Sequence, residues 1–424
     1  MKPSGIEWIG DIPDDWEVTK IGQLYLERNE KVSDREYEAL SVTKHGILKQ
    51  LESAAKTDNG DNRKLVKSGD FVINSRSDRR GSCGISKIDG SVSLINIILM
   101  PTQKIANGYY NYLFRTENFA DEFYKYGNGI VDDLWSTKWT SMKKILVPFP
   151  SLRTQQRIAD YLDEKCGEID ATIAKQKESI EKLKAYKQSL ISETVTKGLD
   201  KSAPLKPSGI DYLGDIPAHW EVKRIKELFS FGKGLPISKE DLIENGVPVI
   251  NYGQIHSKDN NGTSIKDSLI RYVDLNYKNT NMTSLVESGD FIFADTSEDL
   301  DGCGNCIYVD SKYPIFAGYH CIILRYIKRN SSKYLAYLFQ MDAWRTQIRR
   351  DVTGVKVFSI SKKILGKSYI LFPPRYEQEC IVNYLQEKCN EIDVIINKKQ
   401  NIIQKLDAYK KSLIFECVTG KQKI

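Results

Sequence analysis

Two long segments of the chain repeat apolar residues at spacings of three and four positions, with charged and polar residues between them. The first segment has apolar residues at Leu162, Cys166, Ile169, Ile173, Ile180, Leu183 and Leu190. The second segment has them at Leu385, Cys389, Ile392, Ile396, Ile403, Leu406 and Leu413. A 3.5-residue period that persists over about four heptads is typical of a coiled-coil seam. We therefore predict two long helices that pair through these residues.

Proline and glycine mark the ends of the two predicted helices. Pro150 and Pro373 precede them, and Gly198 and Gly420 stand where a left-handed residue commonly ends a helix. About 43 helical residues at 1.5 Å each would make a rod of about 65 Å.

Polar residues interrupt each predicted seam at matching places, Gln176 and Lys187 in the first and Lys399 and Lys410 in the second. Such residues cost stability and select one register and one partner. We expect each helix to pair with the other one. The alternative is that each helix only covers its own domain.

Outside these helices, short β-rich runs bounded by glycine, asparagine or aspartate predict mixed α/β domains. The predicted strands are 70–74, 91–100, 248–252, 290–294 and 319–326. A helix follows in each domain, at about 109–124 and 332–349, and then a glycine-containing loop. The fold class that we expect is α+β, with two mixed α/β domains separated by the two long helices.

The sequence contains an internal duplication, in which the same order of segments occurs twice. Lys2–Leu24 and Lys206–Leu228 are identical at 14 of 23 positions. In the long segments, YLDEKCGEID recurs as YLQEKCNEID, and EKLKAYKQSLI recurs as QKLDAYKKSLI. The repeat predicts five parts: domain 1–150, helix 151–198, linker 199–205, domain 206–373 and helix 374–424.

Composition restricts the class of protein. Of the 424 residues 41% are hydrophobic and 28% are charged, which is typical of a globular chain. No apolar run approaches the roughly 20 residues that a membrane span needs, and the first residues form no hydrophobic signal region. Eight cysteines are too few for a disulfide scaffold. We expect a cytoplasmic protein without a membrane partner.

The sequence lacks the motifs of the common cofactor-binding enzymes. It has no GxxxxGK[ST] phosphate loop, no GxGxxG after a strand, and no amino-methyltransferase tetrad, since 372–376 lacks the required Asp or Asn. Cys303 and Cys306 have CxxC spacing, but no second cysteine or histidine pair completes a zinc site. We expect a binding protein without catalytic residues or metal.

The net charge of +6 neither requires nor excludes a nucleic-acid partner, so local clusters are more informative. The clusters are Arg76, Arg79 and Arg80; Lys138 with Lys143 and Lys144; Arg345, Arg349, Arg350 and Lys356; and Asn251 with Tyr252. Most of them precede or flank the glycine loop of their copy. Arginine forks in such loops can bind guanine and phosphate. For any one cluster the alternative is an ordinary solvated surface.

The duplicated head KPSGIEWIGDIPDDWEV and the paired tails resemble the specificity (S) subunit of type I restriction–modification systems, over essentially the whole chain. The resemblance implies two target recognition domains and tail helices that pair antiparallel, which gives the repeat a pseudo-two-fold axis. Each domain of such a subunit reads one half of a bipartite, asymmetric site in double-stranded DNA. Two modification subunits carrying S-adenosylmethionine dock on the helices and methylate adenine, and restriction subunits use ATP and Mg. The specificity subunit itself holds no cofactor.

On this basis we predict the residues that contact DNA. They are Lys44, Arg76, Arg79, Arg80, Asn128 and Lys138 in the first copy, and Asn251, Tyr252, Arg349, Arg350 and Lys356 in the second. The first glycine loop carries Asp132 and Asp133 and the second is shorter, so we expect the two loops to contact DNA differently. Two other functions stay open: a stand-alone DNA-modifying enzyme, either a nuclease or a fused methyltransferase, and a coiled-coil adaptor without DNA specificity.

Overall fold

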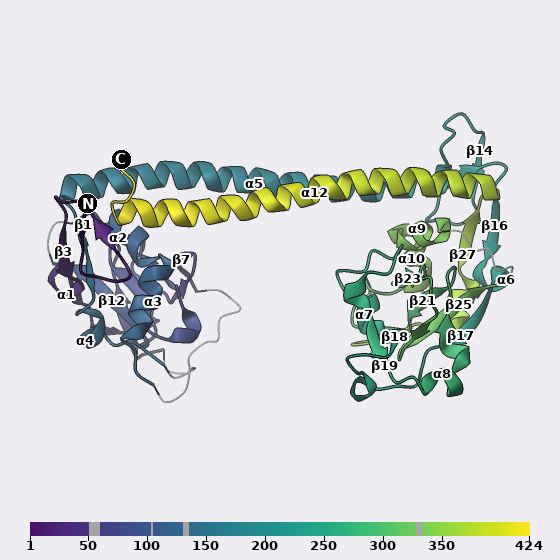
Figure 1. Ribbon diagram of the computed structural model, residues 1–424, viewed down its shortest axis with the longest axis horizontal. Coiled ribbons are helices and arrows are strands. Elements are labelled where there is room, and N and C mark those ends of the chain that lie inside the picture. Colours follow the sequence, from purple (N-terminus) through teal and green to yellow (C-terminus); the bar gives the residue numbers. More distant parts are fainter. Residues whose placement is uncertain (51–59, 103–104, 130–134, 328–332) are drawn as a thin grey trace. The chain divides into compact units, whose positions relative to one another are not determined.

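The computed structural model describes residues 1–50, 60–102, 105–129, 135–327 and 333–424. These residues form two compact units. Unit 1 comprises Met1–Glu178 and Lys399–Ile424, and unit 2 comprises Ser179–Lys398. Each unit contains one mixed domain and a part of both long helices (Figure 1). Among the described residues, no helix combines the length and the apolar character that crossing a membrane would require.

The mixed domain of unit 1 is built on an antiparallel sheet with the strand order β10-β9-β12-β4. Its strands are β1 (Lys2–Pro3), β2 (Asp11–Ile12), β3 (Glu17–Lys20), β4 (Tyr25–Glu27), β5 (Lys31–Val32), β6 (Leu40–Thr43), β7 (Gly46–Lys49), β8 (Arg63–Val66), β9 (Phe71–Asn74), β10 (Cys83–Ile85), β11 (Gly90–Val92), β12 (Asn96–Pro101) and β13 (Leu146–Phe149). Its short helices are α1 (Ile21–Leu24), η1 (Ser77–Arg79), α2 (Asn107–Phe114), α3 (Glu117–Lys125) and α4 (Trp139–Met142). The pairing of β3 with β13 brings the start of the domain next to its end.

The mixed domain of unit 2 repeats this sheet as β23-β21-β25-β17, in the same order and also antiparallel. Its strands are β14 (Leu205–Pro207), β15 (Asp215–Pro217), β16 (Glu221–Arg224), β17 (Phe229–Lys233), β18 (Val247–Ile250), β19 (Arg271–Val273), β20 (Leu285–Val286), β21 (Phe291–Ala294), β22 (Thr296–Ser297), β23 (Cys306–Tyr308), β24 (Ile315–Ala317), β25 (Cys321–Tyr326), β26 (Phe358–Ser359) and β27 (Tyr369–Phe372). Its short helices are α6 (Ile225–Leu228), η3 (Lys239–Asp241), α7 (Tyr252–Ile255), η4 (Asp267–Leu269), α8 (Tyr277–Thr280), η5 (Met282–Ser284), α9 (Tyr334–Gln340), α10 (Asp342–Arg349) and α11 (Lys362–Lys367). The expected α+β fold with an internal repeat is thus confirmed.

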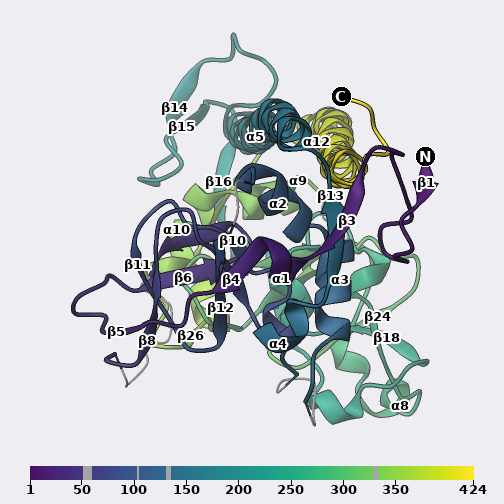
Figure 2. The same ribbon diagram turned by 90° about the vertical axis from the view of Figure 1, so that its left-hand side faces the viewer.

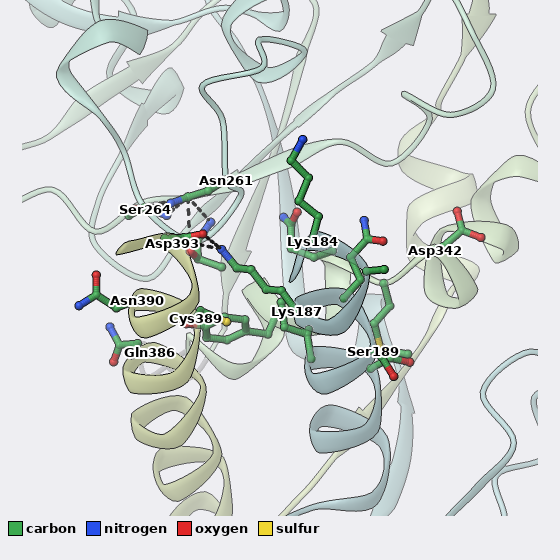
Figure 3. A pocket seen from close by; sticks show the side chains of 18 of the residues that line it. Lys184, Lys187, Ser189, Asn261, Ser264, Asp342, Gln386, Cys389, Asn390 and Asp393 are labelled. Carbon is green, nitrogen blue, oxygen red and sulfur yellow. Dashed lines mark hydrogen bonds and ion pairs between the residues drawn. The ribbon is translucent and has the colours of Figure 1, made fainter. Parts of the chain in front are cut away.

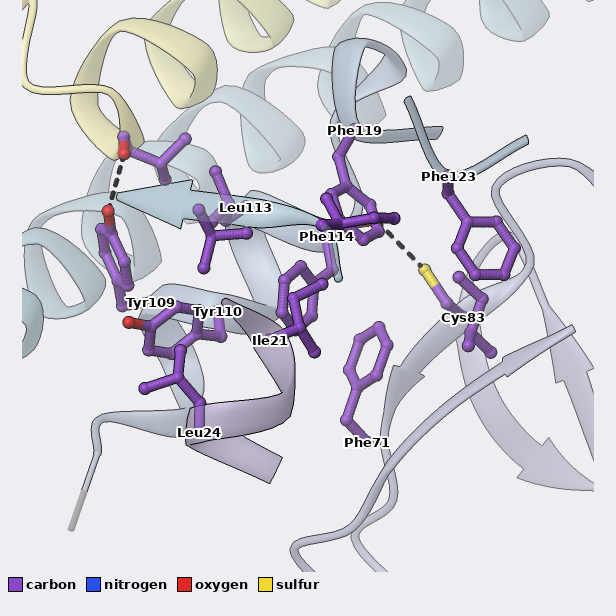
Figure 4. Packing of buried hydrophobic residues seen from close by; sticks show 14 of the residues in the cluster. Ile21, Leu24, Phe71, Cys83, Tyr109, Tyr110, Leu113, Phe114, Phe119 and Phe123 are labelled. Atoms are coloured by element: carbon purple, nitrogen blue, oxygen red, sulfur yellow. Dashed lines mark hydrogen bonds between the residues drawn. The ribbon is translucent and has the colours of Figure 1, made fainter. Parts of the chain in front are cut away.

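Aromatic side chains fill the core of unit 1 (Figure 4). Tyr109, Tyr110 and Phe114 of α2 are fully or almost fully buried, and the ring of Phe114 lies 4.9 Å from that of Phe71 on β9. The hydroxyl of Tyr109 points away from the sheet and donates to the carbonyl of Val418, near the end of the second long helix. Helix α2 therefore packs on both the sheet and the long helices.

Both predicted domain helices are interrupted. The stretch expected at 109–124 is α2 followed by α3, because the side chain of Thr116 accepts a hydrogen bond from the backbone N–H of Phe119 and caps the new helix. The stretch expected at 332–349 is α9 followed by α10, with extended backbone at Met341; its first residue, 332, lies outside the described residues. Apolar spacing alone did not reveal these breaks, since the apolar stripe continues across them.

Two of the predicted strands also end elsewhere. The run 91–100 is split between β11 and β12, and 248–252 ends as a strand at Ile250. Asn251 precedes the first turn of α7, and its backbone N–H donates to the side chain of Gln254.

The long helices are α5 (Leu152–Lys197) and α12 (Arg375–Val418), and parts of both lie side by side in each unit (Figure 1, Figure 2). Gly198 and Gly420 follow them with φ of +72° and +73°, the left-handed conformation predicted for these positions. All the apolar residues of the predicted seam are buried or half-buried: Leu162, Ile169, Ile173, Ile180, Leu183, Leu190, Leu385, Ile392, Ile396, Ile403, Leu406 and Leu413.

Polar contacts along the seam establish the direction of pairing. In unit 1, Lys410 Nζ lies 2.7 and 2.6 Å from the carboxylate oxygens of Asp170, and Lys399 Nζ lies 3.0 Å from Gln176 Oε1. As the residue numbers rise along α5 they fall along α12, so the helices are antiparallel. In unit 2, Lys187 Nζ contacts both carboxylate oxygens of Asp393 at 2.7 Å. Because Lys187 and Asp393 are the repeat equivalents of Lys410 and Asp170, the two units make the same ion pair.

Candidate nucleic-acid interface

In unit 1, three segments that carry predicted DNA-contact residues meet at Ser136. The backbone of Ser136 pairs with Arg76 on one side and with Asn128 on the other. The N–H of Asn128 donates to the carbonyl of Ser136 at 3.0 Å, and that of Ser136 donates back at 3.2 Å. We call this arrangement the platform of unit 1. It brings the arginine loop after β9 next to the glycine loop.

Unit 2 builds the same platform around Ser359. Thr296 pairs with Ser359 within β22 and β26, and Thr353 pairs with it from the other side. The next residue along the chain also behaves alike. The N–H of Thr137 donates to the carbonyl of Ser75 at 3.0 Å in unit 1, and the N–H of Ile360 donates to the carbonyl of Asp295 at 2.7 Å in unit 2. The repeat therefore extends to the backbone of the predicted contact regions, although their side chains differ.

Several predicted contact residues gather on the platform of unit 1. Arg76, Arg79, Asn128 and Lys138 are all exposed. Arg76 and Lys138 line a hollow of about 490 Å³ together with Leu94, Ile95 and Thr140. The sequence separation of Arg76 and Arg79 from Asn128 and Lys138 gives no hint of this convergence, because it depends on the pairing of Arg76 with Ser136.

Two other predicted residues of unit 1 are placed differently. The guanidinium of Arg80 forms an ion pair with Asp121 of α3, so part of its charge is neutralised within the protein. Lys44 is exposed at the turn of the β6–β7 hairpin, and its carbonyl accepts a hydrogen bond from Arg115 at 2.9 Å. Asp132 and Asp133 lie outside the described residues.

In unit 2, the two predicted arginines already bond to protein groups. Arg349 donates to the carbonyls of Leu300 and Asp301 at 3.0 and 3.2 Å and to the carboxylate of Asp342 at 2.6 Å. Arg350 donates to the hydroxyl of Tyr212 at 2.6 Å and stacks over its ring. Arg349 thus holds the backbone of the loop after β22 in place.

The remaining predicted residues of unit 2 have unlike surroundings. Lys356 is exposed beside Gly354. Asn251 is only 1% exposed, neither of its amide atoms has a hydrogen-bond partner among the described residues, and a Cβ on Gly318 would lie 1.6 Å from its Oδ1. A direct contact of Asn251 with DNA would therefore require that its side chain first become exposed.

Tyr252 lines a hollow of about 710 Å³ that adjoins the platform of unit 2. His256 contacts the carbonyl of Thr296 at 2.8 Å through Nε2, and the ring of Tyr252 lies 5.4 Å from that of His320. Arg345 donates to Asn305 Oδ1 at 2.6 Å at the same hollow, and burial lowers the pKa of its guanidinium from the ordinary value. Glu298, Asp299 and Asp301 complete an acidic rim. The charge of this surface differs from that of the arginine loop in unit 1.

Sequence reasoning missed the lysines that follow the platform of unit 2. Lys362, Lys363 and Lys367 are exposed on α11. In unit 1 the corresponding stretch carries Lys138, Lys143 and Lys144. Aligning the two copies over this stretch would have revealed the shared basic character, which suits contacts with phosphates.

The cysteine pair that resembles a CxxC motif is part of the core. Cys303 and Cys306 are buried, and burial raises the pKa of the Cys306 thiol to about 12 and also raises that of Cys303. A thiol that stays protonated is a poor nucleophile and a poor metal ligand.

Unit 2 also has a hollow where the long helices meet the mixed domain (Figure 3). Its volume is about 1390 Å³. Lys184, Lys187 and Ser189 line it from α5, Gln386, Asn390 and Asp393 line it from α12, and Asn261, Ser264 and Asp342 line it from the mixed domain. Polar, charged and apolar side chains all line this surface, and Arg345 lines both it and the hollow that adjoins the platform.

Comparisons with known proteins agree with this architecture. A family model described as the type I restriction modification DNA specificity domain matches residues 13–184 and 217–405. The specificity subunit of the type I restriction enzyme MjaVIII from Methanocaldococcus jannaschii is 24% identical over 432 residues, which cover 97% of this chain and 94% of that protein. The EcoKI specificity subunit from Escherichia coli is 21% identical over 337 residues, or 76% and 67% of the two chains.

Two solved structures share the fold. One is a chain from a structure that addresses complex assembly and conformational transition of the type I R-M system, with a TM-score of 0.73 at 13% identity and coverage of 97% and 100%. The other is the HsdS subunit from Thermoanaerobacter tengcongensis, with a TM-score of 0.54 at 14% identity and coverage of 97% and 98%.

Proposed function

The chain belongs to the type I restriction–modification DNA specificity family, and on that premise we propose that each of its two recognition domains reads one half of a bipartite, asymmetric target in double-stranded DNA. As a specificity subunit it selects the site on which an enzyme complex acts.

The observation that carries the proposal is the pair of equivalent platforms with unlike side chains. The backbone around Ser136 is repeated around Ser359, whereas the loop that holds Arg79 and Arg80 in unit 1 holds Asp299 and Leu300 at the aligned positions of unit 2. Base edges in the major groove are distinguished by donors, acceptors and methyl groups. Equivalent loops with different side chains would therefore read different bases, which makes the target asymmetric.

We propose that the exposed lysines after each platform bind phosphates and the loops bind base edges. Phosphate contacts fix the register of a protein on the duplex but carry no sequence information. Each copy carries three exposed lysines in this stretch, whereas the side chains of the loops differ, which matches this division of roles.

The paired helices would set the distance between the two half-sites and dock two modification subunits. The ion pairs Lys410–Asp170 and Lys187–Asp393 support this role, because they fix the register of α5 against α12 in each unit. The hollow between the helices and the recognition domain of unit 2 (Figure 3), lined by both polar and apolar side chains, is the surface that we assign to one modification subunit.

We further propose that the chain makes no covalent change in DNA itself. S-adenosylmethionine would be bound by the modification subunits that methylate adenine, and ATP and Mg by restriction subunits. An isolated chain that transfers methyl groups or cleaves DNA would contradict this part.

Sequencing of N6-methyladenine in cells with and without this chain tests the central proposal and also gives the target. Exchange of residues 25–147 for those of another family member should then change one half of the methylated motif and leave the other half unchanged. A change in both halves would show that the two domains do not read independently. Exchange of residues 229–368 is the matched experiment for unit 2.

A further inference from the structure

Val355 has the most exposed large apolar side chain among the described residues, with 94% of its surface accessible. Val357 is 51% exposed, and Lys356 between them is exposed as well. Single apolar residues are common on protein surfaces. Here, however, two valines flank a lysine at the tip of one loop, so a small exposed apolar surface lies next to a positive charge.

The loop that presents Val355 is held by its base and by a required glycine. The N–H of Ser359 donates to the carbonyl of Thr353 at 3.0 Å, and β26 pairs with β22 immediately beyond it. Gly354 has φ of +139°, and a Cβ at this position would lie 2.0 Å from the carbonyl oxygen of Val357. We call Gly354–Val357 the finger. Its closed base positions the apolar tip relative to the platform of unit 2.

The other copy of the repeat has the same sequence feature. Asn128 takes the place of Thr353 on the platform of unit 1, so Gly129 aligns with Gly354 and Ile130 aligns with Val355. Ile130 lies outside the described residues. Both copies thus place a β-branched apolar residue directly after the glycine of this loop.

The surroundings of the finger indicate what it meets. Lys356 is part of the finger, and Lys362 and Lys363 lie exposed at the start of α11, close behind it along the chain. These cations suit phosphates near an apolar contact. On the major-groove edge of the base pairs, the apolar group is the 5-methyl of thymine. The side chains known to wedge between base steps are Phe, Leu, Ile, Met and Pro, and valine is not among them.

We propose that Val355 reads the 5-methyl group of a thymine in the half-site bound by unit 2, while Lys356 and the α11 lysines bind neighbouring phosphates. The inference rests on the proposed function, because it assumes that this recognition domain binds DNA. It adds a specificity-determining residue and the chemical group that this residue recognises.

The test uses the full chain assembled with its cognate modification subunits. The duplex carries the target sequence that sequencing of N6-methyladenine identifies. Thymines of the half-site of unit 2 are replaced one at a time by deoxyuridine, which lacks only the methyl group. The unaltered complex should lose roughly five- to tenfold in affinity at one position. The Val355→Ala complex should bind the thymine and uracil duplexes with equal and similarly reduced affinity.

Leu275→Ala provides the matched control, since Leu275 is a 64% exposed apolar residue elsewhere in unit 2. This variant should keep the preference for thymine.

Equal binding of both duplexes by the unaltered complex, or a half-site without an A·T pair, overturns the inference. So does a Val355→Ala complex that binds both duplexes more weakly but still prefers thymine over uracil, which would indicate a wedge. Loss of the modification subunits from Val355→Ala without DNA would instead assign the finger to a protein partner. If no duplex is bound specifically by the unaltered complex, the proposed function itself fails.

Discussion

The hydroxyl of Tyr109 donates a 2.7 Å hydrogen bond to the carbonyl of Val418, a residue 309 positions away in the chain (Figure 4). Its repeat equivalent Tyr334 donates to the carbonyl of Val195 at 2.8 Å in unit 2. The last carbonyls of a helix have no intrahelical donor, so each tyrosine satisfies a group that would otherwise be left without a partner. Both recognition domains are attached in the same way to the end of a long helix, α12 in unit 1 and α5 in unit 2.

Replacing Tyr109 by Phe should lower the free energy of unfolding by about 1–3 kcal/mol, since it removes this bond and leaves a buried carbonyl unpaired. Urea unfolding of the full chain measures the change. Tyr186→Phe is the control, because Tyr186 is 59% exposed on α5. An unchanged midpoint for Tyr109→Phe would mean that water replaces the lost donor.

The contact between Gln176 and Lys399 predicts a charge-swap result. Gln176→Lys places two half-buried ammonium groups at the 3.0 Å contact and should destabilise the chain by about 1 kcal/mol at low salt. The swapped double variant Gln176→Lys/Lys399→Gln should regain most of the loss, because the pair is restored with its partners exchanged. Thermal unfolding at two salt concentrations measures both effects. Failure of the double variant to recover would argue against this register.

Arg79→Ala and Lys138→Ala should separate base contacts from phosphate contacts. If Arg79 binds a base, its loss weakens binding of the assembled complex by about 1–3 kcal/mol and relaxes one position of the motif. Loss of Lys138 should weaken binding to all duplexes. It should also reduce the slope of log affinity against log salt concentration by about one, the equivalent of one phosphate contact. Titrations on target and random duplexes distinguish the two outcomes. Unaltered affinity in Arg79→Ala would make that loop an ordinary solvated surface.

Arg349 should act mainly through the loop that it holds. Arg349→Ala leaves the carbonyls of Leu300 and Asp301 without this donor and should cost about 1–3 kcal/mol of stability. Arg349→Lys should restore little, since a single ammonium group does not reproduce the fork of donors that reaches both carbonyls and Asp342. Two measurements test this: the free energy of unfolding of both variants, and the DNA motif that the complex assembled with each variant methylates. A stable Arg349→Ala variant with a changed motif would instead favour a direct base contact.

The buried cysteines should resist alkylation. Because burial raises the pKa of Cys306 to about 12, almost none of its thiol is ionised at pH 8. Cys380 is exposed and should be labelled at least roughly a hundredfold faster in the native chain. Mass spectrometry after timed labelling tests this, with denatured chain as the control. Rapid native labelling of Cys306 would contradict the burial of this strand.

The fold was predictable from the sequence where one physical signal dominates. The seams of α5 and α12 follow from a 3.5-residue period, and their ends follow from Gly198 and Gly420, where a left-handed conformation excludes most side chains. The breaks at Thr116 and Met341 were missed, because a capping hydroxyl or one extended residue leaves the apolar pattern unchanged.

The candidate interface was predictable as regions but not as side chains. The sequence placed basic residues near the glycine loops, and the equivalence of Ser136 and Ser359 brings those regions together in both units. Which charges remain available depends on partners that are distant along the chain. Arg80 is paired with Asp121, and Arg349 is bonded to Leu300 and Asp301.

By itself, then, the sequence determined the duplicated plan, the two pairing helices and the family, since repeats and periodicity are properties of neighbouring residues. Tertiary structure alone decided the burial of Asn251 against Gly318, the two tyrosine bonds to the helix ends and the exposure of Val355. Burial and hydrogen bonding are set by whichever groups the folded chain brings within a few ångströms. No local pattern encodes those neighbours.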